Sequence, residues 1–259
     1  MSYSKILYSV QERICTITMH RPEKRNALDD IVIQELTSAI VAASKDTAVK
    51  VIVLTGHNSI FCAGADLEYL QKLSHYDFNQ NSDDSKSLMR LFQLMYTLRK
   101  PIIAKVNGPA IAGGCGLATV CDIIIASSAA TFGYTEVKIG FIPAIVLPFL
   151  VKRIGEAKAR ELVLTGNILS AHQALSIGLV NEVVDADTLD TRVTEISQAL
   201  CNGSSNSSMG LIKEMLSTIG SMNINDALEF ASNMNAVVRM SEDCKKGISA
   251  FINKEKNIW

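Results

Sequence analysis

The sequence lacks a charge excess of either sign. Its 25 Lys and Arg residues almost balance 26 Asp and Glu residues, and the formal net charge over 259 residues is −1. Proteins that bind nucleic acid through phosphate contacts carry a basic excess, so we expect no nucleic-acid partner. Basic residues gather only locally, at Arg21, Lys24 and Arg25. Such a trio is usually a solvated face, although it could meet a phosphate.

Long apolar runs are also absent. No uncharged stretch approaches the roughly 20 residues that a helix needs to span a bilayer. The first residues, MSYSKILYSVQERICTITMHRP, contain no long apolar signal core. We therefore expect a cytoplasmic protein that has no membrane partner.

The patterns of disulfide frameworks, metal sites and serine hydrolases are missing as well. The six cysteines form no CxxC pair, and the four histidines show neither metal spacing nor HExxH. Free cysteine in an apolar segment behaves as a small hydrophobe, so we expect reduced thiols and no metal. No GxSxG elbow surrounds Ser127 or Ser128, which argues against a serine hydrolase.

Apolar residues make up 48% of the chain, which is enough for a sizeable core, and their spacing predicts its elements. Alternating stretches and short apolar runs predict strands at 5–10, 15–20, 49–54, 102–106 and 180–184. Helical spacing predicts helices at 26–46, 66–73, 88–98, 156–164, 170–177 and 188–200. Residues 75–85 are polar and aperiodic, and we expect a mobile excursion there. The alternation of strands and helices indicates an α/β core with mostly parallel strands.

The C-terminal part has a different character. GSSNSS at 203–208 is a composition shift, and only helical patterns follow it, at 209–219, 225–240 and 243–251. We therefore divide the chain into residues 1–200, the core that binds and transforms substrate, and residues 201–259, a helical region. Helices with apolar faces and no sheet of their own pack either on their own core or against another subunit. Both alternatives stay open at this point.

Two turns rich in small residues carry the chemistry. SIFCAGAD at 59–66 and VNGPAIAGGCG at 106–116 each follow an apolar strand and open a helix. The first N–H groups of a helix have no internal partner, the helix dipole favours negative charge there, and small residues let a ligand approach. Two such N–H groups facing each other would form an oxyanion hole. Each turn alone is more typical of packing, and neither has the features of a phosphate-binding loop.

One acidic residue, Glu136, follows the second turn in a loop-like setting. A carboxylate near an oxyanion hole is a candidate general acid or base. From sequence chemistry alone, an ordinary surface or capping glutamate is the commoner alternative. Asp122, at the start of an apolar run, is more typical of a residue that caps nearby backbone than of a catalytic group.

Five segments in a fixed order carry a resemblance to a known family. They are HRPEKRNAL at 20–28, FCAGADL at 61–67, the block at 106–140, ELVLTGNILSAHQALSIGLVNEVV at 161–184 and GISAFINKEK at 247–256. Over nearly its whole length the chain resembles the crotonase (enoyl-CoA hydratase/isomerase) superfamily. The resemblance implies an α/β fold, a crotonase (ClpP-like) spiral of ββα units with a C-terminal helical trimerisation domain. It also implies acyl-CoA thioester substrates, homotrimers often paired into hexamers, and no cofactor, because CoA is part of the substrate.

The resemblance also assigns site residues by position. The oxyanion hole falls on the N–H groups of Ala65 and Gly113, which would hold the thioester oxygen as it becomes an enolate. The loop that meets the adenine and pantetheine of CoA falls on Ala63, Gly64, Asp66 and Leu67. The region near the CoA phosphates and adenine falls on Lys24, Arg25 and Ala27, and the positions near CoA of a neighbouring subunit fall on Phe251 and Lys254.

Family hydratases use two glutamates, and the resemblance places them at Gly116 and Glu136, so this chain keeps one. Hydration of an enoyl thioester needs a base for water and an acid for the α-carbon; two carboxylates share these tasks readily, and one can do both in sequence. A double-bond shift needs one base, and family isomerases work with the equivalent of Glu136 alone. The bulky turn from Pro143 to Leu147, where many hydratases have glycines, would shrink the acyl pocket or exclude water.

The resemblance thus implies hydration of a 2-enoyl-CoA, including branched substrates of the methylglutaconyl-CoA type, in fatty acid metabolism. One alternative is an enoyl-CoA double-bond isomerase that uses Glu136 alone. Another is a non-catalytic acyl-CoA-binding protein that assembles with a partner. RNA binding, which one branch of the family shows, gains little support from the balanced charge.

Overall fold

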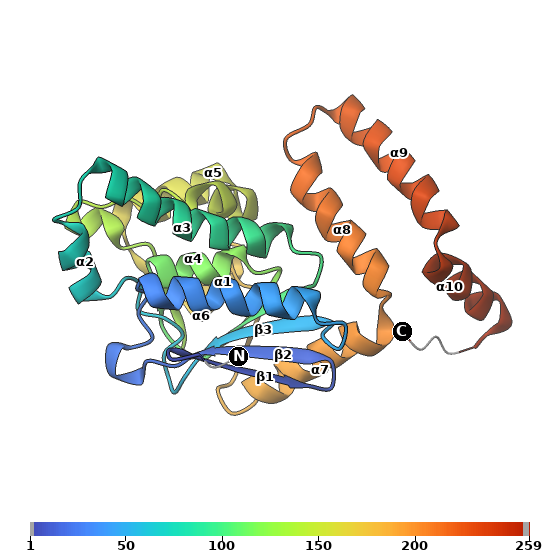
Figure 1. The fold of residues 1–259 in the computed structure, drawn as a ribbon, viewed down its shortest axis with the longest axis horizontal. Coiled ribbons are helices and arrows are strands. Elements are labelled where there is room, and N and C mark those ends of the chain that lie inside the picture. Colours follow the sequence, from blue (N-terminus) through green and yellow to red (C-terminus); the bar gives the residue numbers. More distant parts are fainter. Residues whose placement is uncertain (1–2, 256–258) are drawn as a thin grey trace.

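A six-stranded sheet lies at the centre of the fold, which a computed structural model describes for residues 3–255 and residue 259 (Figure 1). In spatial order its strands are β1 (Ile6–Gln11), β2 (Ile14–Met19), β3 (Val51–Gly56), β4 (Ile102–Val106), β6 (Ile123–Ser127) and β9 (Glu182–Val184). Only the β1–β2 pair is antiparallel. Every residue of β3 is buried, which explains its continuous apolar run.

A smaller sheet accompanies the first and turns the chain into a spiral. Its strands are β5 (Ala110–Ile111), β7 (Thr131–Gly133) and β8 (Ile168–Ser170). The chain passes from β4 to β5 to α4, and then from β6 to β7 to the 3₁₀ turn η2 (Glu136–Ile139). Each step visits the large sheet, then the small sheet, then a helical segment. This repeat is the ββα spiral that the resemblance implies.

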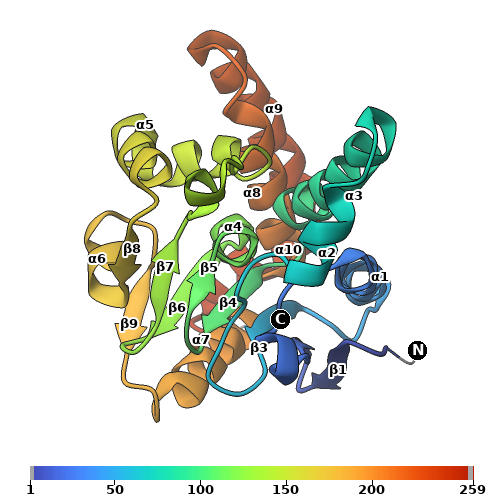
Figure 2. The same cartoon turned by 90° about the vertical axis from the view of Figure 1, so that its left-hand side faces the viewer.

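Helices cover both faces of the large sheet (Figures 1 and 2). They are η1 (Pro22–Lys24), α1 (Asp30–Lys45), α2 (Leu67–Leu73), α3 (Phe78–Thr97), α4 (Gly113–Val120), α5 (Leu147–Thr165), α6 (Ala171–Ser176) and α7 (Leu189–Gly203). The larger apolar core joins α1, α3, α4 and α5 to one face, with Leu54 and Phe92 fully buried. A smaller core packs Val193 of α7 on Val53 and Ile103 of the opposite face.

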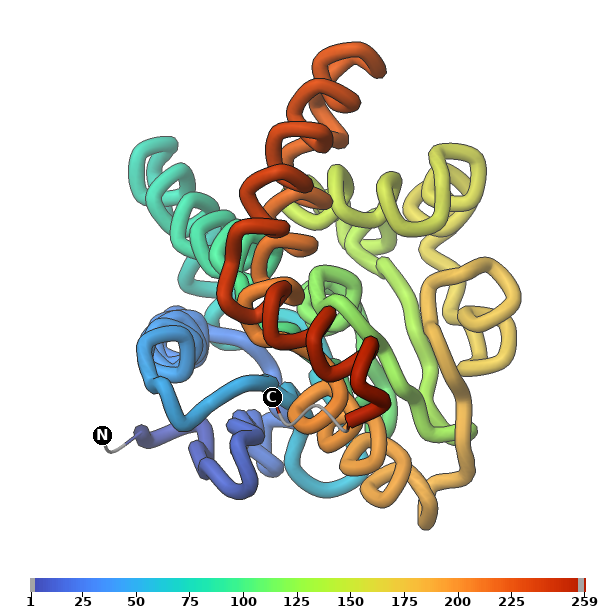
Figure 3. The backbone as a smooth tube through the Cα atoms, turned by 90° about the vertical axis from the view of Figure 1, so that its right-hand side faces the viewer, coloured from blue at the N-terminus to red at the C-terminus, as the bar shows by residue number. Residues whose placement is uncertain are grey.

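Three C-terminal helices, α8 (Asn206–Ile219), α9 (Ile224–Met240) and α10 (Glu242–Asn253), extend away from this body (Figures 1 and 3). Lys213 docks α8, because its Nζ donates to the Lys100 carbonyl (3.1 Å) and binds Asp122 Oδ2 (2.5 Å). None of the 17 residues of α9 is buried. Large apolar side chains are exposed on α9 and α10, namely Ile224, Leu228, Val237, Met240, Ile248, Phe251 and Ile252. Within one chain, α9 therefore does not pack on the core.

The predicted mobile excursion at 75–85 is wrong, because α3 already begins at Phe78. The Gln80 N–H donates to Asp77 Oδ1 (2.9 Å) and the Asp77 N–H donates to Gln80 Oε1 (3.0 Å), which is a capping box. The first turns of α3 are largely exposed, so a polar sequence is compatible with a helix. The start of α1 was also misplaced: its cap is Asp29, not a residue near Asn26.

Two further boundaries differ from the sequence predictions. α5 begins at Leu147 and contains Gly155 at φ 76°, a break that hides its first turns from a periodicity search. The strands β5, β7 and β8 have two or three residues each and are too short to leave a period. The proposed division at residue 200 stays a prediction, and α7 runs through that position to Gly203.

Candidate active site

The two small-residue turns lie side by side. Cys62 and Ala110 form a parallel β-bridge, and the N–H of Ile111 donates to the Cys62 carbonyl (2.9 Å). Ala65 follows Cys62 by three residues, and Gly113 follows Ala110 by three residues. Ala65 and Gly113, the two predicted oxyanion-hole residues, therefore lie at equivalent distances along the chain from this bridge, although they are far apart in the sequence.

The Ala65 N–H points away from Leu28, the residue with which Ala65 forms a parallel bridge. The Leu28 N–H donates to the Gly64 carbonyl (2.7 Å), and the Asp66 N–H donates to the Leu28 carbonyl (2.8 Å). Because a trans peptide is planar, the N–H of the Gly64–Ala65 peptide points opposite to the carbonyl that Leu28 holds. Gly113 is the first residue of α4, where a backbone N–H has no acceptor within the helix.

The second turn is strained and tightly packed. Ala112 has φ 50° and ψ −124°, a region that residues with a Cβ rarely adopt. Strain of this kind costs on the order of 1–3 kcal/mol and concentrates at functional sites. The Ala112 N–H donates to the Gly133 carbonyl (2.7 Å), which holds the turn. A Cβ on Gly114 would lie 2.3 Å from the Cys62 carbonyl oxygen, so only glycine fits there.

Glu136 is placed by the small sheet. β5 and β7 are parallel with Ile111 opposite Gly133, so the chain reaches Glu136 three residues beyond the strand that neighbours the Gly113 turn. The Glu136 side chain is buried, and its Oε2 has no hydrogen-bond partner among residues 3–255 and 259. Burial raises the pKa of this carboxyl above its ordinary value of 4.5. A raised pKa brings a carboxyl closer to the range in which it can both accept and donate a proton during a reaction.

The surroundings of Gly116 are apolar. A Cβ on Gly116 would lie 3.2 Å from two ring carbons of Phe92 and 3.3 Å from Val146 Cγ2. Phe92 is itself buried against the edge of Phe149, with ring centroids 6.2 Å apart. Val146 belongs to the bulky turn that begins at Pro143, as the sequence led us to expect. A side chain at position 116 would therefore require Phe92 or Val146 to shift by a few tenths of an ångström.

Most of the residues expected to meet CoA within one chain line one cavity of about 310 Å³. Its lining consists of Glu23, Lys24, Arg25, Ala27, Ala63, Ala65, Asp66 and Leu67. All of these except Glu23 were expected from the sequence, and Gly64 belongs to the same turn. Because Ala65 lines the cavity and also belongs to the paired turns, the cavity adjoins the predicted oxyanion hole.

Side chains around this cavity bind one another. Lys24 Nζ pairs with Glu68 Oε1 (2.5 Å) at the surface. The Asp66 carboxylate points inward, where it accepts from the Glu68 N–H (2.9 Å) and from Arg21 Nη2 (2.8 Å). Arg21 is buried, so its interpretation as part of a solvated face is wrong. Nothing in the local sequence shows that two distant acidic residues, Asp29 and Asp66, meet it.

Phe251 and Lys254 lie elsewhere in the chain. Phe251 is on α10 with 85% of its surface exposed, and Lys254 is the left-handed residue that ends this helix. Neither lines the cavity at Lys24 and Ala65. Their expected contact with CoA of a neighbouring subunit stays a prediction. Asp122 does cap backbone, as the sequence predicted, because its Oδ2 accepts from the Ile102 N–H (2.7 Å).

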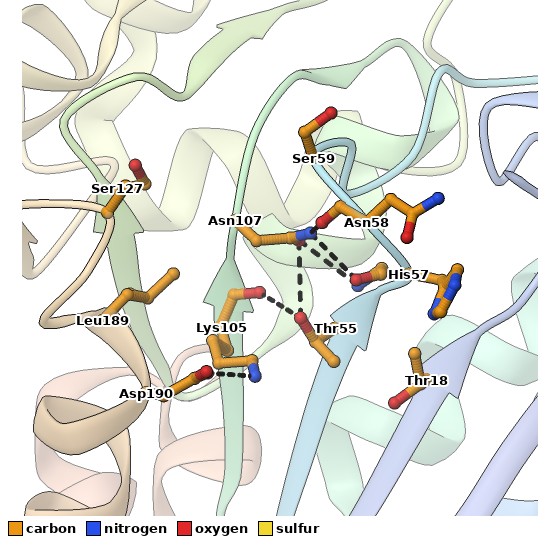
Figure 4. Close-up of a pocket in the computed structure, with 12 residues that line it drawn as sticks. Thr18, Thr55, His57, Asn58, Ser59, Lys105, Asn107, Ser127, Leu189 and Asp190 are labelled. Atoms are coloured by element: carbon orange, nitrogen blue, oxygen red, sulfur yellow. Dashed lines mark hydrogen bonds and ion pairs between the residues drawn. The ribbon is translucent and has the colours of Figure 1, made fainter.

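A larger hollow of about 460 Å³ lies at the carboxyl ends of β3, β4 and β6, away from the predicted residues (Figure 4). Its polar groups bind one another: Lys105 Nζ pairs with Asp190 Oδ1 (2.5 Å), and Asn107 Nδ2 donates to the Gly56 carbonyl (2.9 Å). No predicted catalytic residue lines it, so we assign it no ligand.

Within 3–255 and 259 no cluster of three or more His, Cys, Asp and Glu side chains could hold a metal ion. Over the same residues no helix combines the length and apolarity needed to cross a membrane.

The spiral and the paired turns beside a buried carboxyl define the crotonase class of fold. The sequence pattern of the enoyl-CoA hydratase/isomerase family matches residues 9–259, and the chain belongs to this family. A relative from Thermus thermophilus is 38% identical over 93% of this chain and 95% of its own length. Crotonyl-CoA hydratase of Syntrophomonas wolfei is 31% identical over 99% of this chain and 98% of its own. The crystal structure of an enoyl-CoA hydratase from Shewanella pealeana is similar with a TM-score of 0.94, at 29% identity, over 99% of this chain and 96% of that one.

Proposed function

We propose that this protein adds water to the double bond of a 2-enoyl-CoA thioester. The observation that carries the proposal is the buried Glu136 carboxyl, whose Oε2 has no hydrogen-bond partner in the part of the chain that the structure describes and which follows β7, the strand beside the Gly113 turn. The relatives named as hydratases support this reaction class. CoA recognition is assigned to the cavity at Lys24 and Ala65.

The chemistry needs only groups that this chain supplies. The Glu136 carboxylate takes a proton from water, and the water oxygen forms a bond to the β-carbon. The π electrons move onto the thioester oxygen, and the N–H groups of Ala65 and Gly113 stabilise the enolate that results. Glu136 then returns the proton to the α-carbon, and the thioester carbonyl is restored. The raised pKa of Glu136 suits a carboxyl that must hold the proton between the two steps.

Double-bond isomerisation is the second candidate, and the surroundings of Gly116 favour it. Glycine supplies no carboxylate at position 116 to position water, and Phe92 and Val146 make the surroundings of this glycine apolar. In a 3-enoyl-CoA, Glu136 would remove a proton from the α-carbon and return it to the γ-carbon, through the same stabilised enolate. Hydration and isomerisation would thus share every group except the nucleophilic water.

Several finer points belong to the same proposal. We assign the substrate range to include branched 2-enoyl-CoA esters of the methylglutaconyl-CoA type, and the setting to cytoplasmic fatty acid metabolism. No cofactor is required, because the reaction is neither a redox nor a group-transfer step. A homotrimer, or a hexamer of two trimers, would cover the exposed apolar residues of α9 and α10 and bring Phe251 near a neighbour's CoA.

Incubation with 2-enoyl-CoA and with 3-enoyl-CoA in heavy-oxygen water distinguishes the candidates. Label in a 3-hydroxyacyl-CoA product from 2-enoyl-CoA supports hydration. A shifted double bond without label, from 3-enoyl-CoA, supports isomerisation instead. If the protein binds both esters but converts neither, both enzyme assignments fail and a non-catalytic acyl-CoA-binding protein is the account that remains.

A further inference from the structure

We infer that Arg21 is a positioning residue, which orients the Ala65 N–H by holding together the two chain segments that pair at the Leu28–Ala65 bridge. The inference rests on the proposed oxyanion hole. Arg21 does not line the CoA cavity, and it touches neither Glu136 nor the Gly113 turn in any hydrogen bond or ion pair that the described residues form. Its effect would therefore pass through its neighbours.

The Arg21 guanidinium binds both segments that pair at the Leu28–Ala65 bridge. Its Nη1 donates to the Ala27 carbonyl (2.7 Å), and its Nη2 donates to Asp66 Oδ2 (2.8 Å). Ala27 precedes Leu28, and Asp66 follows Ala65. The planar guanidinium thus connects Ala27 on one side of the Leu28–Ala65 bridge to Asp66 on the other. This connection fixes the register and separation of the bridge.

This bridge decides where the Ala65 N–H points. The Leu28 N–H holds the Gly64 carbonyl at 2.7 Å, and the planar peptide aims the Ala65 N–H in the opposite direction. A small rotation of that peptide would turn the N–H away from a thioester oxygen. Donors in an oxyanion hole act only when they point at the position of the developing charge, so this rotation would cost rate.

The charges around Arg21 favour a rigid arrangement. Arg21 is also 3.1 Å from Asp29 Oδ2, which Lys5 contacts as well, so two cations and two carboxylates form one network in which Lys5 alone is only half-buried. Burial alone would raise the pKa of Asp66, but the hydrogen bond from Arg21 and those from backbone N–H groups outweigh it, and the pKa is lowered. Asp66 thus stays ionised and keeps its ion pair with Arg21.

Lysine cannot reproduce the arrangement at position 21. A guanidinium presents several donors in a fixed plane, whereas an ammonium group is a point charge on a flexible stem. Arg21→Lys keeps the charge that the network needs, so the protein is expected to fold. The Ala27 and Asp66 contacts can no longer be made together in one plane, which loosens the bridge.

The test measures kcat, KM and enolate formation for Arg21→Lys. We expect kcat for the enoyl-CoA substrate to fall about tenfold to a hundredfold, with KM changed less than about threefold. A bound 3-oxoacyl-CoA ester reports the hole directly, because its enolate has its own ultraviolet absorption. We expect that absorption to weaken in parallel with kcat. Asp66→Asn, which keeps the size of the side chain and removes its charge, is expected to act in the same direction.

Arg153→Lys is the matched control. Arg153 also donates to backbone carbonyls, those of Cys121 (2.7 Å) and Leu179 (2.8 Å), but at the opposite end of α4 from Gly113. This variant is expected to lower the melting temperature without changing kcat or the enolate signal.

Two results with the variants would overturn the inference. One is an Arg21→Lys variant that loses stability but keeps kcat and the enolate absorption, since Arg21 would then be structural only. The other is an equal loss of kcat in Arg153→Lys. A wild-type protein that forms the enolate but does not hydrate enoyl-CoA would contradict the proposed reaction and leave the positioning test intact. A wild-type protein that does neither would remove the oxyanion hole and this inference together.

Discussion

Two turns of the same layout present the proposed oxyanion hole, and they are held in different ways. The turn at 63–66 leads into α2, a short helix without a buried residue, and its Asp66 both caps this helix and pairs with Arg21. The turn at 110–114 leads into α4, which is buried almost throughout and has no side-chain cap. Backbone hydrogen bonds hold both turns, but the first also depends on the Arg21–Asp66 ion pair, whereas the second depends on close backbone packing around Gly114.

The difference predicts how each turn responds to substitution. A turn that side chains hold can loosen by degrees, because a shorter or uncharged group keeps part of the contacts. A turn held by backbone packing cannot loosen gradually in this way, because any added atom must displace backbone atoms. The second turn should therefore tolerate less than the first, although we propose that both present one N–H group to the same oxygen.

Gly114→Ala should have the largest effect, because the new Cβ would lie 2.3 Å from the Cys62 carbonyl oxygen. We expect kcat/KM to fall at least about a hundredfold, since a shift of this size misplaces the Gly113 N–H. Thermal unfolding should also show a loss of about 1–3 kcal/mol from overpacking. Gly203→Ala is the control, because nothing lies within 4 Å of a Cβ there. Equal activity of the two variants would contradict the steric account.

Gly116→Glu should destabilise the protein without improving hydration. The Cβ of the new side chain would lie 3.2 Å from ring carbons of Phe92 and 3.3 Å from Val146 Cγ2, so the carboxylate would be added to apolar surroundings. Burial of an unpaired polar group costs about 1–3 kcal/mol in proteins, and more when it is charged. Denaturant unfolding measures the loss, and heavy-oxygen incorporation measures the rate. A stable variant that hydrates faster would mean that the space beside residue 116 is open.

Ala112→Gly should stabilise the second turn slightly. Glycine relieves the strain of φ 50°, which costs on the order of 1–3 kcal/mol, but loses more chain entropy on folding, about 0.5–1 kcal/mol. The expected balance is a gain of about 1 kcal/mol in the free energy of unfolding. A loss of stability would show that Ala112 is not strained in the native protein.

Lys24→Gln should have the smallest effect and should be confined to binding. Lys24 lies at the edge of the CoA cavity and pairs with the exposed Glu68, so its removal is expected to leave the melting temperature unchanged. The KM for a CoA ester should rise about threefold while kcat stays constant, as for an interaction made equally in the ground and transition states. A change in kcat would mean that Lys24 also affects the position of the first turn during the reaction.

The sequence was informative where chemistry is local. Small residues at the junction of strand and helix marked both turns, and the resemblance pointed to Ala65, Gly113 and Glu136. The first turns of α3 were missed although their signal is local as well: Asp77 and Gln80 have the spacing of a capping box, and the polar composition concealed it.

Contacts between distant segments could not be predicted. Arg21 is followed by a proline and lies among charged residues, which is typical of a surface loop, and only the fold brings Asp29 and Asp66 to it. The side chains that face Gly116 come from α3 and from the turn before α5, so their contact depends on packing that no local pattern records.

The central claim is that Glu136 alone transfers the proton while the two turns hold the oxygen. Turnover of enoyl-CoA by Glu136→Gln, measured beside the affinity for a saturated acyl-CoA, tests it most directly. The account predicts a loss of kcat by about two to four orders of magnitude, as for removal of a general acid–base group, with the affinity nearly unchanged. Retained turnover would contradict the account, and so would loss of binding, because Glu136 would then be structural.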